Sequence, residues 1–341
     1  MRCIALGQAL GSRGASLTFL MREPGQSIAE TLSAEGFGLH RLQESEGAAS
    51  ELQAGAGWLT APWEFDAEQT IHAMKNRRAD WIVVDHYGID RRWEARVKSA
   101  GCRVLAIDDL ANRAHDADIV VDHNIGHEQT ALYQDLVTPS CRMLLGPRYA
   151  LLRQEFSRIR QTAMPRTGPV KRILVMFGGS DPGGEAIKAV RGMRMLNRQS
   201  VRMDVIAGSL NKMKNELRAA CAEDPRINFF DSLQQVAVAM SAADLAIGAC
   251  GISALERSSM YLPAIAVVIA DNQRDIGREL ASRGIAEVLG WHENVRPESY
   301  ATAIETLCGN PDRLREMSVA AGAIVDAQGA DRVADIVGDR S

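Results

Sequence analysis

The 341-residue sequence has few aromatic residues, no surplus of basic charge and no long apolar run. Aromatic residues make up 5% of the chain and the formal net charge is -4. Without a basic stripe, binding to the phosphate backbone of a nucleic acid is not expected. No apolar run reaches the roughly 18 residues that a membrane-spanning helix requires. The first residues also lack the pattern of a signal peptide, so we expect a cytoplasmic protein.

The cysteines form no metal-binding or disulfide pattern. All six are scattered, without a CxxC pair and without clustered histidines. Zinc sites need closely spaced Cys or His ligands, so no metal and no other cofactor is predicted. We interpret these residues as reduced thiols, mostly buried. They are Cys3, Cys102, Cys141, Cys221, Cys250 and Cys308.

Short apolar runs indicate an α/β protein with parallel strands. Hydrophobic residues make up 46% of the chain, and many runs are β-branched and end at Asp or at a polar loop. This pattern is typical of parallel strands whose carboxyl ends open onto a ligand crevice. The predicted strands are Ser16–Met21, Trp81–Asp85, Arg103–Asp108, Asp118–Asp122, Arg172–Phe177, Val201–Ala207, Ile227–Phe230, Asp244–Ala249 and Ala264–Ile269.

The chain length and a Pro/Gly-rich stretch predict two Rossmann-like domains. A chain of this length exceeds one typical core, and residues 164–169 contain two prolines and a glycine, which break helices and strands. We expect domains at 1–163 and 170–341, with the last helix packing back on the first domain. Residues 1–10 read as a helix with no strand before it. Ligand binding is expected in a cleft between the domains of a monomer.

Two segments of the second half are suited to a nucleotide. Gly178, Gly179 and Ser180 directly follow a strand, where glycines let backbone N–H groups approach an anion, although a plain tight turn explains them equally. Ser253 and Glu256 have capping-box spacing after a tight turn at Gly251. Glu256 is therefore either a helix cap or an acceptor for ribose hydroxyls, and the spacing favours neither.

Other polar residues lie at predicted strand ends. Asn272 and Gln273 offer amides that suit a sugar with hydroxyl and acetamido groups, or a helix cap. His86 and Tyr87 are candidates for proton transfer, although strand-end packing is the better interpretation of His86.

Three further features remain ambiguous from the sequence. Asp108 and Asp109 are adjacent, and neighbouring strand residues point to opposite faces, so they cooperate only if the strand has already ended. Arg148 and Arg153 precede the predicted linker in the sequence. An arginine there either binds a phosphate or is a surface charge exposed to solvent. His123 follows the next strand and is equally open to both interpretations.

Together these segments resemble the UDP-2,4-diacetamido-2,4,6-trideoxy-β-L-altropyranose hydrolases, which act in pseudaminic acid biosynthesis for bacterial surface glycans. The resemblance covers nearly the whole chain and implies a glycosyltransferase-B-like fold of two Rossmann-like domains. The order and spacing of the motifs carry it. The motifs are VVDHYGID (83–90), AIDDLANR (106–113), LLGPRYALLRQEF (144–156), ILVMFGGSDPGG (173–184), DLAIGACGISALER (244–257) and ADNQRDIGREL (270–280).

The resemblance implies hydrolysis of a UDP-linked sugar, without a metal, by attack of water at the anomeric carbon. It assigns UDP mainly to the second domain, with Glu256 on the ribose, and it places Tyr87 and Arg153 at the substrate. The substrate-binding residues implied are Tyr87, Arg153, Gly178, Gly179, Ser180, Gly251, Ser253, Glu256, Asn272 and Gln273.

The sequence departs from that family at its start. The family opens with a strand and a Gly-x-Gly-His loop whose histidine is the general base. This sequence begins at Met1-Arg2-Cys3 and contains neither the strand nor the loop. One expectation is a reading frame that starts too late. Another is a short protein that binds the nucleotide and lacks the base, for which His86 is a weak substitute. A glycosyltransferase, a non-catalytic UDP-sugar-binding protein and an unstable fragment are the alternatives.

Overall fold

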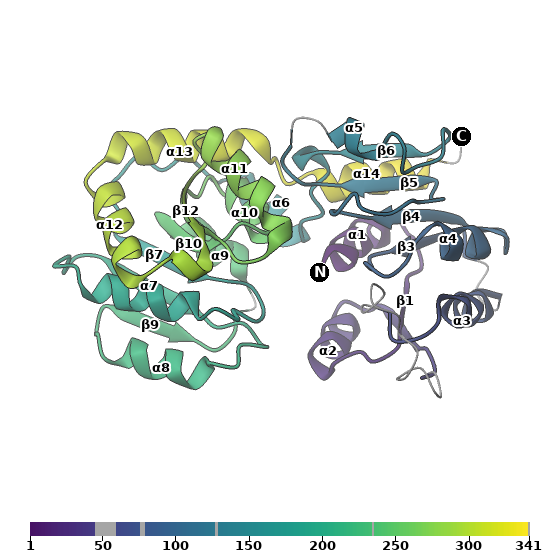
Figure 1. Cartoon of the computed structure of the whole chain (residues 1–341), viewed down its shortest axis with the longest axis horizontal. Helices are drawn as coiled ribbons and strands as arrows, with labels where there is room; N and C mark the ends of the chain where they lie inside the picture. Colours follow the sequence, from purple (N-terminus) through teal and green to yellow (C-terminus); the bar gives the residue numbers. More distant parts are fainter. Residues whose placement is uncertain (45–58, 76–78, 127–128, 234, 340–341) are drawn as a thin grey trace. The chain divides into compact units, whose positions relative to one another are not determined.

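The computed structural model describes residues 1–44, 59–75, 79–126, 129–233 and 235–339. The chain divides into two compact units (Figure 1). The first contains Met1–Gln154 and Gly329–Ser341, and the second contains Glu155–Gln328. Both are built from parallel strands joined by helices. Within the described ranges, no helix has both the length and the apolar character needed to cross a membrane.

The first unit contains two separate parallel sheets. One has the order β3-β4-β5-β6 and the other pairs β1 with β2. The strands are β1 (Thr18–Met21), β2 (Gly38–Arg41), β3 (Trp81–Val84), β4 (Arg103–Ile107), β5 (Ile119–Asp122) and β6 (Arg142–Leu145). The helices are α1 (Arg2–Gly11), α2 (Gln26–Ala34), α3 (Trp63–Lys75), α4 (Arg91–Lys98), α5 (Gln129–Tyr133), η2 (Pro147–Tyr149) and α14 (Gly329–Gly338).

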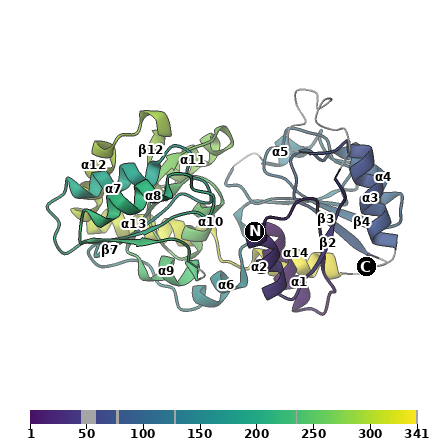
Figure 2. The same ribbon diagram turned by 90° about the horizontal axis from the view of Figure 1, so that it is seen from below.

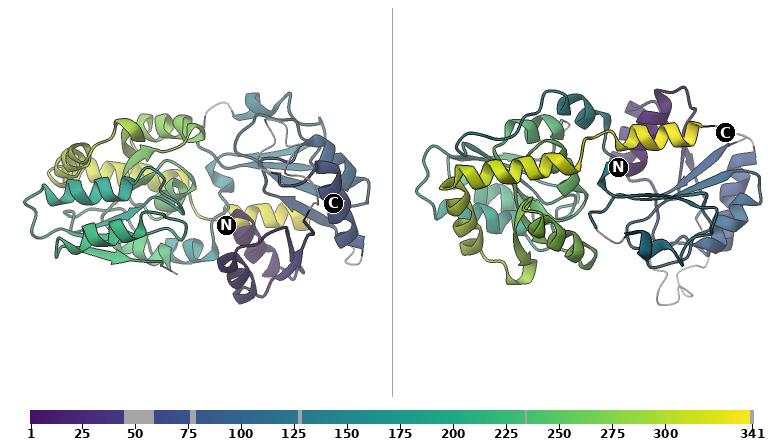
Figure 3. Two further views of the ribbon diagram at one scale, coloured as in Figure 1. Left: turned by 60° about the horizontal axis from the view of Figure 1, so that its bottom comes forward. Right: turned by 90° about the horizontal axis from the view of Figure 1, so that it is seen from above.

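Helices cover both faces of the four-stranded sheet, because its central strands are apolar on both sides. On one face, Leu105 and Val121 pack with residues of α1 and α14. On the other face, Val104 and Val120 pack with residues of α3 and α4. Figures 2 and 3 show α14, drawn in yellow, beside α1, drawn in purple. Arg13, just after α1, forms ion pairs with Asp331 and Asp335 of α14 at 2.9 and 2.7 Å.

The second unit is a six-stranded parallel sheet of order β12-β11-β10-β7-β8-β9. Its strands are β7 (Arg172–Met176), β8 (Arg202–Ile206), β9 (Ile227–Phe230), β10 (Leu245–Ala249), β11 (Ala264–Val268) and β12 (Ala286–Trp291). Its helices are α6 (Gln154–Arg160), α7 (Glu185–Arg194), α8 (Lys214–Ala222), α9 (Val236–Ala242), α10 (Ile252–Ser259), η3 (Asp271–Gln273), α11 (Arg274–Ser282), η4 (His292–Asn294), α12 (Pro297–Cys308) and α13 (Pro311–Ile324). One large apolar core lies on this sheet.

The division between the units falls at residues 154 and 155 and not in the predicted linker at 164–169. Two half-buried arginines, one just before this stretch and one within it, hold it to the second unit. Arg160 donates to the carbonyl oxygens of Ser259 and Gly322, each at 2.7 Å. Arg166 donates to the carbonyl oxygen of Ala243 at 2.8 Å. The predicted linker is therefore part of the packed second unit, while α14, beyond it in sequence, belongs to the first.

Candidate functional site

Three loops with predicted binding residues leave the second sheet from neighbouring strands. β7, β10 and β11 are adjacent and parallel, so their carboxyl ends lie at one edge of the sheet. Gly178–Ser180 follows β7, Gly251 follows β10 and Gln273 follows β11. A side-chain carbon placed on Gly251 would lie 3.2 Å from Nε2 of Gln273, which shows that these two loops are in contact. We call the group formed by Gly178–Ser180, Gly251 and Gln273 the second-unit edge.

Close backbone packing shapes the glycine loop. Gly178 has a φ of 76°, in the left-handed region that favours glycine. The backbone N–H of Leu210 donates to the carbonyl oxygen of Gly179 at 3.0 Å. A Cβ atom on Gly208 would lie 2.1 Å from the carbonyl oxygen of Gly179. Gly208 is therefore the residue that lets the β8 loop support the glycine loop, a role that the sequence analysis missed.

Replacement of Gly208 by alanine is expected to displace the glycine loop, because a contact of 2.1 Å with backbone atoms cannot be relieved by a rotamer change. We expect the free energy of unfolding to fall by about 1–3 kcal/mol, and, for UDP bound at this loop as the sequence resemblance implies, we expect its affinity to fall by at least about tenfold. Calorimetric titration and chemical denaturation measure these quantities. Gly338→Ala is the matched control, because no atom lies within 4 Å of the added carbon there. An unchanged UDP affinity in Gly208→Ala would contradict the role of this loop.

Helix α10 begins at Gly251, and the capping-box interpretation of Ser253 and Glu256 is wrong. Gly251 is the N-cap and no side chain caps the helix. The hydroxyl oxygen of Ser253 instead accepts a hydrogen bond from Arg257 at 3.1 Å. The glycine is the N-cap because the chain leaves β10 in a tight turn that places the helix start two residues earlier than the spacing predicted. Glu256, half-buried on α10, is thus not the partner of a capping box.

A buried arginine lies under the start of α10. Arg257 is 3% exposed and donates to the carbonyl oxygen of Ala249 at 2.7 Å. Burial lowers the pKa of Arg257 to about 10, which still leaves it charged near neutral pH. Its Nε atom has no partner among the described residues. This positive charge and the helix dipole both favour an anion at the second-unit edge.

Gln273 and Asn272 differ in how they are held. Oε1 of Gln273 accepts a hydrogen bond from the backbone of Ile269 at 3.2 Å, which fixes the amide beside Gly251. Asn272 is exposed on η3. Neither η3 nor α11 has a side-chain cap at its start, so the helix-cap interpretation of Asn272 is wrong.

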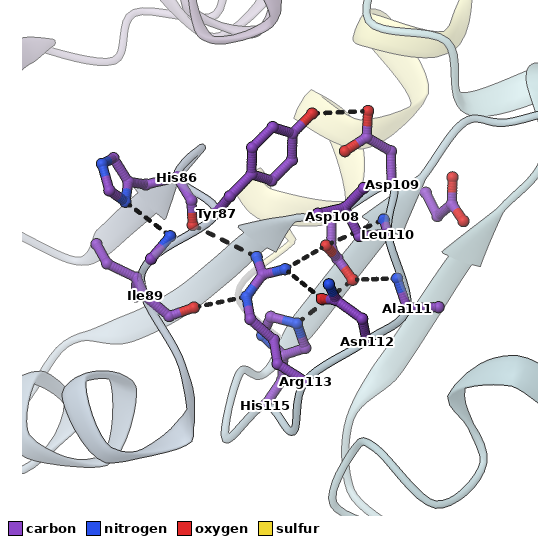
Figure 4. Close-up of polar contacts among 12 residues, drawn as sticks. His86, Tyr87, Ile89, Asp108, Asp109, Leu110, Ala111, Asn112, Arg113 and His115 are labelled. Atoms are coloured by element: carbon purple, nitrogen blue, oxygen red, sulfur yellow. Dashed lines mark hydrogen bonds and ion pairs between the residues drawn. The ribbon is translucent and has the colours of Figure 1, made fainter. Parts of the chain in front are cut away.

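At the carboxyl ends of β3 and β4, Tyr87 and Asp109 form a polar pair (Figure 4). The Tyr87 hydroxyl donates to Oδ2 of Asp109 at 3.1 Å, and Arg2 forms an ion pair with the same oxygen at 3.0 Å. Arg2 also donates to Asp85 at 3.1 Å. Burial and the charge of Asp109 raise the pKa of Tyr87 to about 12, so Tyr87 stays a neutral proton donor. Oδ1 of Asp109 is buried without a partner among the described residues.

β4 ends at Ile107, which would allow Asp108 and Asp109 to cooperate, but the two side chains have different partners, Arg113 and Tyr87. Asp108 is fully buried, and Arg113 donates to it at 2.8 Å. Burial alone would raise its pKa, but His115 and Arg113 hold the pKa of Asp108 well below its usual range. Figure 4 shows Asp108 turned toward Arg113 and Asp109 turned toward Tyr87. Asp108 is thus a structural carboxylate, and Asp109 is the aspartate that is paired with Tyr87.

The buried groups around Asp108 make stability depend on pH. Burial alone would lower the pKa of His115, but its interactions with the carboxylates of Asp108 and Glu94 outweigh burial and raise the pKa to about 9. Burial, followed by the nearby carboxylates, raises the pKa of Asp122 to about 7. A folded-state pKa above the unfolded value gives stability that is complete at low pH. That stability is lost as pH rises through the folded pKa.

Between pH 6.5 and 9.5, the free energy of unfolding is therefore expected to fall by roughly 3 kcal/mol from His115 alone. Urea denaturation at each pH measures it. His115→Gln should flatten the upper part of this dependence, while His72→Gln, at an exposed position on α3, should leave it unchanged. Stability that rises over the same interval in the native protein would contradict the assignment.

The other first-unit candidates are His86, His123 and Arg153. Nδ1 of His86 accepts a hydrogen bond from the backbone of Gly88 at 3.1 Å, which turns the ring onto its own loop (Figure 4). His123 is 2% exposed, and burial together with the charge of Arg2 lowers its pKa to about 3. Arg153 is half-buried in the segment before α6.

The sequence analysis missed Arg2 and Arg257 as site residues. Arg2 was read only as part of a helix start, and Arg257 only as the last residue of a motif. The hydrophilic side chain of Arg257 among small and apolar neighbours was the available signal. In the described part of the chain, no group of three or more His, Cys, Asp or Glu residues is placed to hold a metal ion.

No protein-family model matches the chain. Three curated relatives are similar to parts of it. An uncharacterized protein of Methanocaldococcus jannaschii is 24% identical over 69% of the chain, which spans about half (49%) of that protein. The spore coat polysaccharide biosynthesis protein SpsG of Bacillus subtilis is 22% identical over 80% of both. A UDP-2,4-diacetamido-2,4,6-trideoxy-β-L-altropyranose hydrolase of Campylobacter jejuni is 29% identical over 33% of the chain and 40% of that protein.

Solved structures resemble the whole chain. MurG of Acinetobacter baumannii has a TM-score of 0.65 at 16% identity and covers 98% of this chain and 94% of its own. The UDP co-structure of MnaA from S. aureus has a TM-score of 0.64 at 12% identity, over 96% and 90%. The chain therefore has the α/β glycosyltransferase-B fold, as the sequence predicted.

Proposed function

We propose that the second-unit edge binds the UDP part of a UDP-linked sugar and that the chain releases UDP from it by hydrolysis. The observation that supports this most is the convergence of three features at one sheet edge. They are the glycine loop after β7, the start of α10 near Arg257, which no side chain caps, and the amide of Gln273. Backbone N–H groups and a positive helix end are suited to a diphosphate.

Each residue has a proposed task. Gly178, Gly179 and Ser180 approach the diphosphate, Glu256 accepts hydrogen bonds from the ribose hydroxyls, and Asn272 and Gln273 contact the sugar. The remaining assignments are Gly251 and Ser253 at the α10 start, and Tyr87 and Arg153 on the sugar side.

Tyr87 and Asp109 are the proposed proton-transfer pair. Asp109 accepts the proton of the attacking water, whose oxygen forms a bond to the anomeric carbon while the bond from that carbon to UDP breaks and UDP leaves. Tyr87 and Arg2 both bind Oδ2 of Asp109 and so fix the orientation of its carboxylate.

The test incubates the chain with a UDP-2,4-diacetamido-2,4,6-trideoxy sugar without an acceptor. Chromatography measures the amounts of UDP and free sugar that are released. Free sugar and UDP in equal amounts would support hydrolysis. The part-length likeness to the Campylobacter jejuni hydrolase motivates this choice of sugar. No release by a folded chain that binds the UDP-sugar would contradict hydrolysis.

Transfer of the sugar to an acceptor is the second candidate. It is supported by the likeness to the Bacillus subtilis relative, which is named for polysaccharide biosynthesis and aligns over 80% of both chains. UDP release that occurs only after an acceptor glycan is added would distinguish transfer from hydrolysis. UDP-sugar binding with no release under either condition would indicate a non-catalytic binding protein.

A further inference from the structure

A buried carboxylate lies directly after the glycine loop of the second unit. Asp181 follows Ser180 in the sequence and is 3% exposed. Its φ of 43° is in the left-handed region, although it precedes Pro182 and residues before a proline prefer extended backbone. Unfavourable backbone conformations persist where the surrounding structure fixes them, and they cluster at ligand-binding sites. A plain turn does not explain why a carboxylate is held at this place.

The carboxylate of Asp181 occupies the start of α7. Its Oδ1 accepts a hydrogen bond from the backbone N–H of Glu185 at 2.9 Å, and its Oδ2 accepts one from that of Ala186 at 3.0 Å. Backbone N–H groups at a helix start are the groups that commonly bind a phosphate. Asp181 therefore takes the place that a phosphate would have at α7, whereas no side chain caps the start of α10.

No cation of its own balances the negative charge of Asp181. Both of its oxygens accept N–H groups, which is the pattern of an ionised carboxylate. Lys188 pairs instead with Glu185, a second buried carboxylate, at 2.6 Å, and over the part of the chain that the structure describes no ion pair reaches Asp181. Burial raises the pKa of Asp181, because the N–H groups and Lys188 offset burial only in part. Uncompensated negative charge therefore lies beside the glycine loop.

The segment that carries this charge is closely packed. A Cβ atom on Gly183 would lie 2.9 Å from Nδ1 of His292 and 3.2 Å from Oε1 of Glu185. Lys188 donates to the carbonyl oxygen of His292 at 2.9 Å, and the Tyr300 hydroxyl donates to Glu185 at 2.6 Å. These contacts join the start of α7 to η4 and α12. The carboxylate of Asp181 therefore has little freedom to turn away from an anion that binds beside it.

An anion on the glycine loop lies close to Asp181. Neighbouring Cα atoms are about 3.8 Å apart, so a phosphate on the backbone N–H of Ser180 lies within about 10 Å of the Asp181 carboxylate. At an effective dielectric constant of about 20, two unit charges at that separation repel each other enough to weaken binding about tenfold. Each further negative charge on a ligand adds to this repulsion.

We propose that Asp181 is a specificity-determining residue through which the second-unit edge discriminates between uridine nucleotides by their charge, an inference that rests on the UDP-sugar function proposed above. Near neutral pH a UDP-sugar carries about two negative charges, UDP about three and UTP about four. Asp181 therefore favours the substrate over the product UDP, and it favours UDP over a nucleoside triphosphate. The same repulsion promotes the departure of UDP after the reaction.

The test measures the affinities of the full chain for uridine, UDP and UTP by calorimetric competition, without divalent cations. Asp181→Asn removes the charge and keeps the shape, and asparagine tolerates the left-handed backbone. We expect uridine affinity to stay within about twofold of the native value, UDP affinity to rise at least about threefold and UTP affinity to rise at least about tenfold. Asp312→Asn, exposed on α13, is the control for loss of one charge and should leave all three affinities unchanged.

Asp181→Gly is the second variant, because glycine suits a positive φ and also lacks the charge. A gain in affinity that grows with ligand charge would support the proposal, since a merely structural role would weaken all three ligands together. Unchanged ratios among the three affinities in the folded variants would overturn it. Native protein that binds UTP as tightly as UDP would overturn it without any variant. Native protein that does not bind UDP would contradict the proposed function and this inference with it.

Discussion

Replacement of Asp109 by asparagine is expected to lower the rate of UDP release by at least about 100-fold, the scale of general acid–base catalysis. Asparagine keeps the shape of the side chain but cannot take a proton from water. Arg2 should stay in place, because it is also bonded to Asp85. UDP affinity should remain within about twofold of the native value, because UDP binding is assigned to the second unit.

Steady-state UDP release and calorimetric UDP titration separate these two effects. Asp312→Asn, on the exposed side of α13, removes an equal charge away from the site and should leave the rate unchanged. Tyr87→Phe should lower the rate less, because it removes one hydrogen bond to Asp109 and leaves the carboxylate. A native rate in Asp109→Asn would remove Asp109 from the reaction.

Replacement of Glu256 by glutamine is expected to weaken UDP binding by about 10- to 100-fold. Hydrogen bonds to a charged group contribute about 1.5–3 kcal/mol, and glutamine retains the shape but not the charge. The structure removes the competing interpretation, because α10 is capped by the backbone of Gly251 and forms no capping box. Stability should therefore change little.

Calorimetric titration with UDP and with 2′,3′-dideoxy-UDP tests this assignment. The native protein should bind UDP more tightly than the dideoxy compound, and this preference should be smaller in Glu256→Gln, because an amide oxygen is a weaker acceptor than a carboxylate. Glu298→Gln, exposed on α12, is the control for loss of one negative charge. A Glu256→Gln protein that keeps the full native preference for UDP would place the ribose elsewhere.

The buried strands could be predicted from the sequence because each carries a compact apolar run. Ile227–Phe230 matches β9 residue for residue, and Arg103–Asp108 differs from β4 by one residue. Three strands were missed. Gly38–Arg41, Arg142–Leu145 and Ala286–Trp291 contain polar or small residues, so none of them shows a compact apolar run.

Side-chain partners could be predicted less well than strands, since they depend on where a turn begins. A shift of two residues at the start of α10 turned Ser253 from an expected cap into a partner of Arg257. Asp108 and Asp109 both follow the end of β4 at Ile107, yet different partners, Arg113 and Tyr87, separate their side chains. Arg2 reaches Asp109 across more than 100 residues of sequence, a contact that no local pattern encodes.

Calorimetric titration of the native chain with UDP and with uridine tests most directly whether the second-unit edge is a nucleotide diphosphate site. We expect one UDP site per chain and uridine binding at least about tenfold weaker, because the glycine loop and the start of α10 bind the diphosphate. Absence of UDP binding by the folded protein, or equal binding of UDP and uridine, would contradict the proposed function.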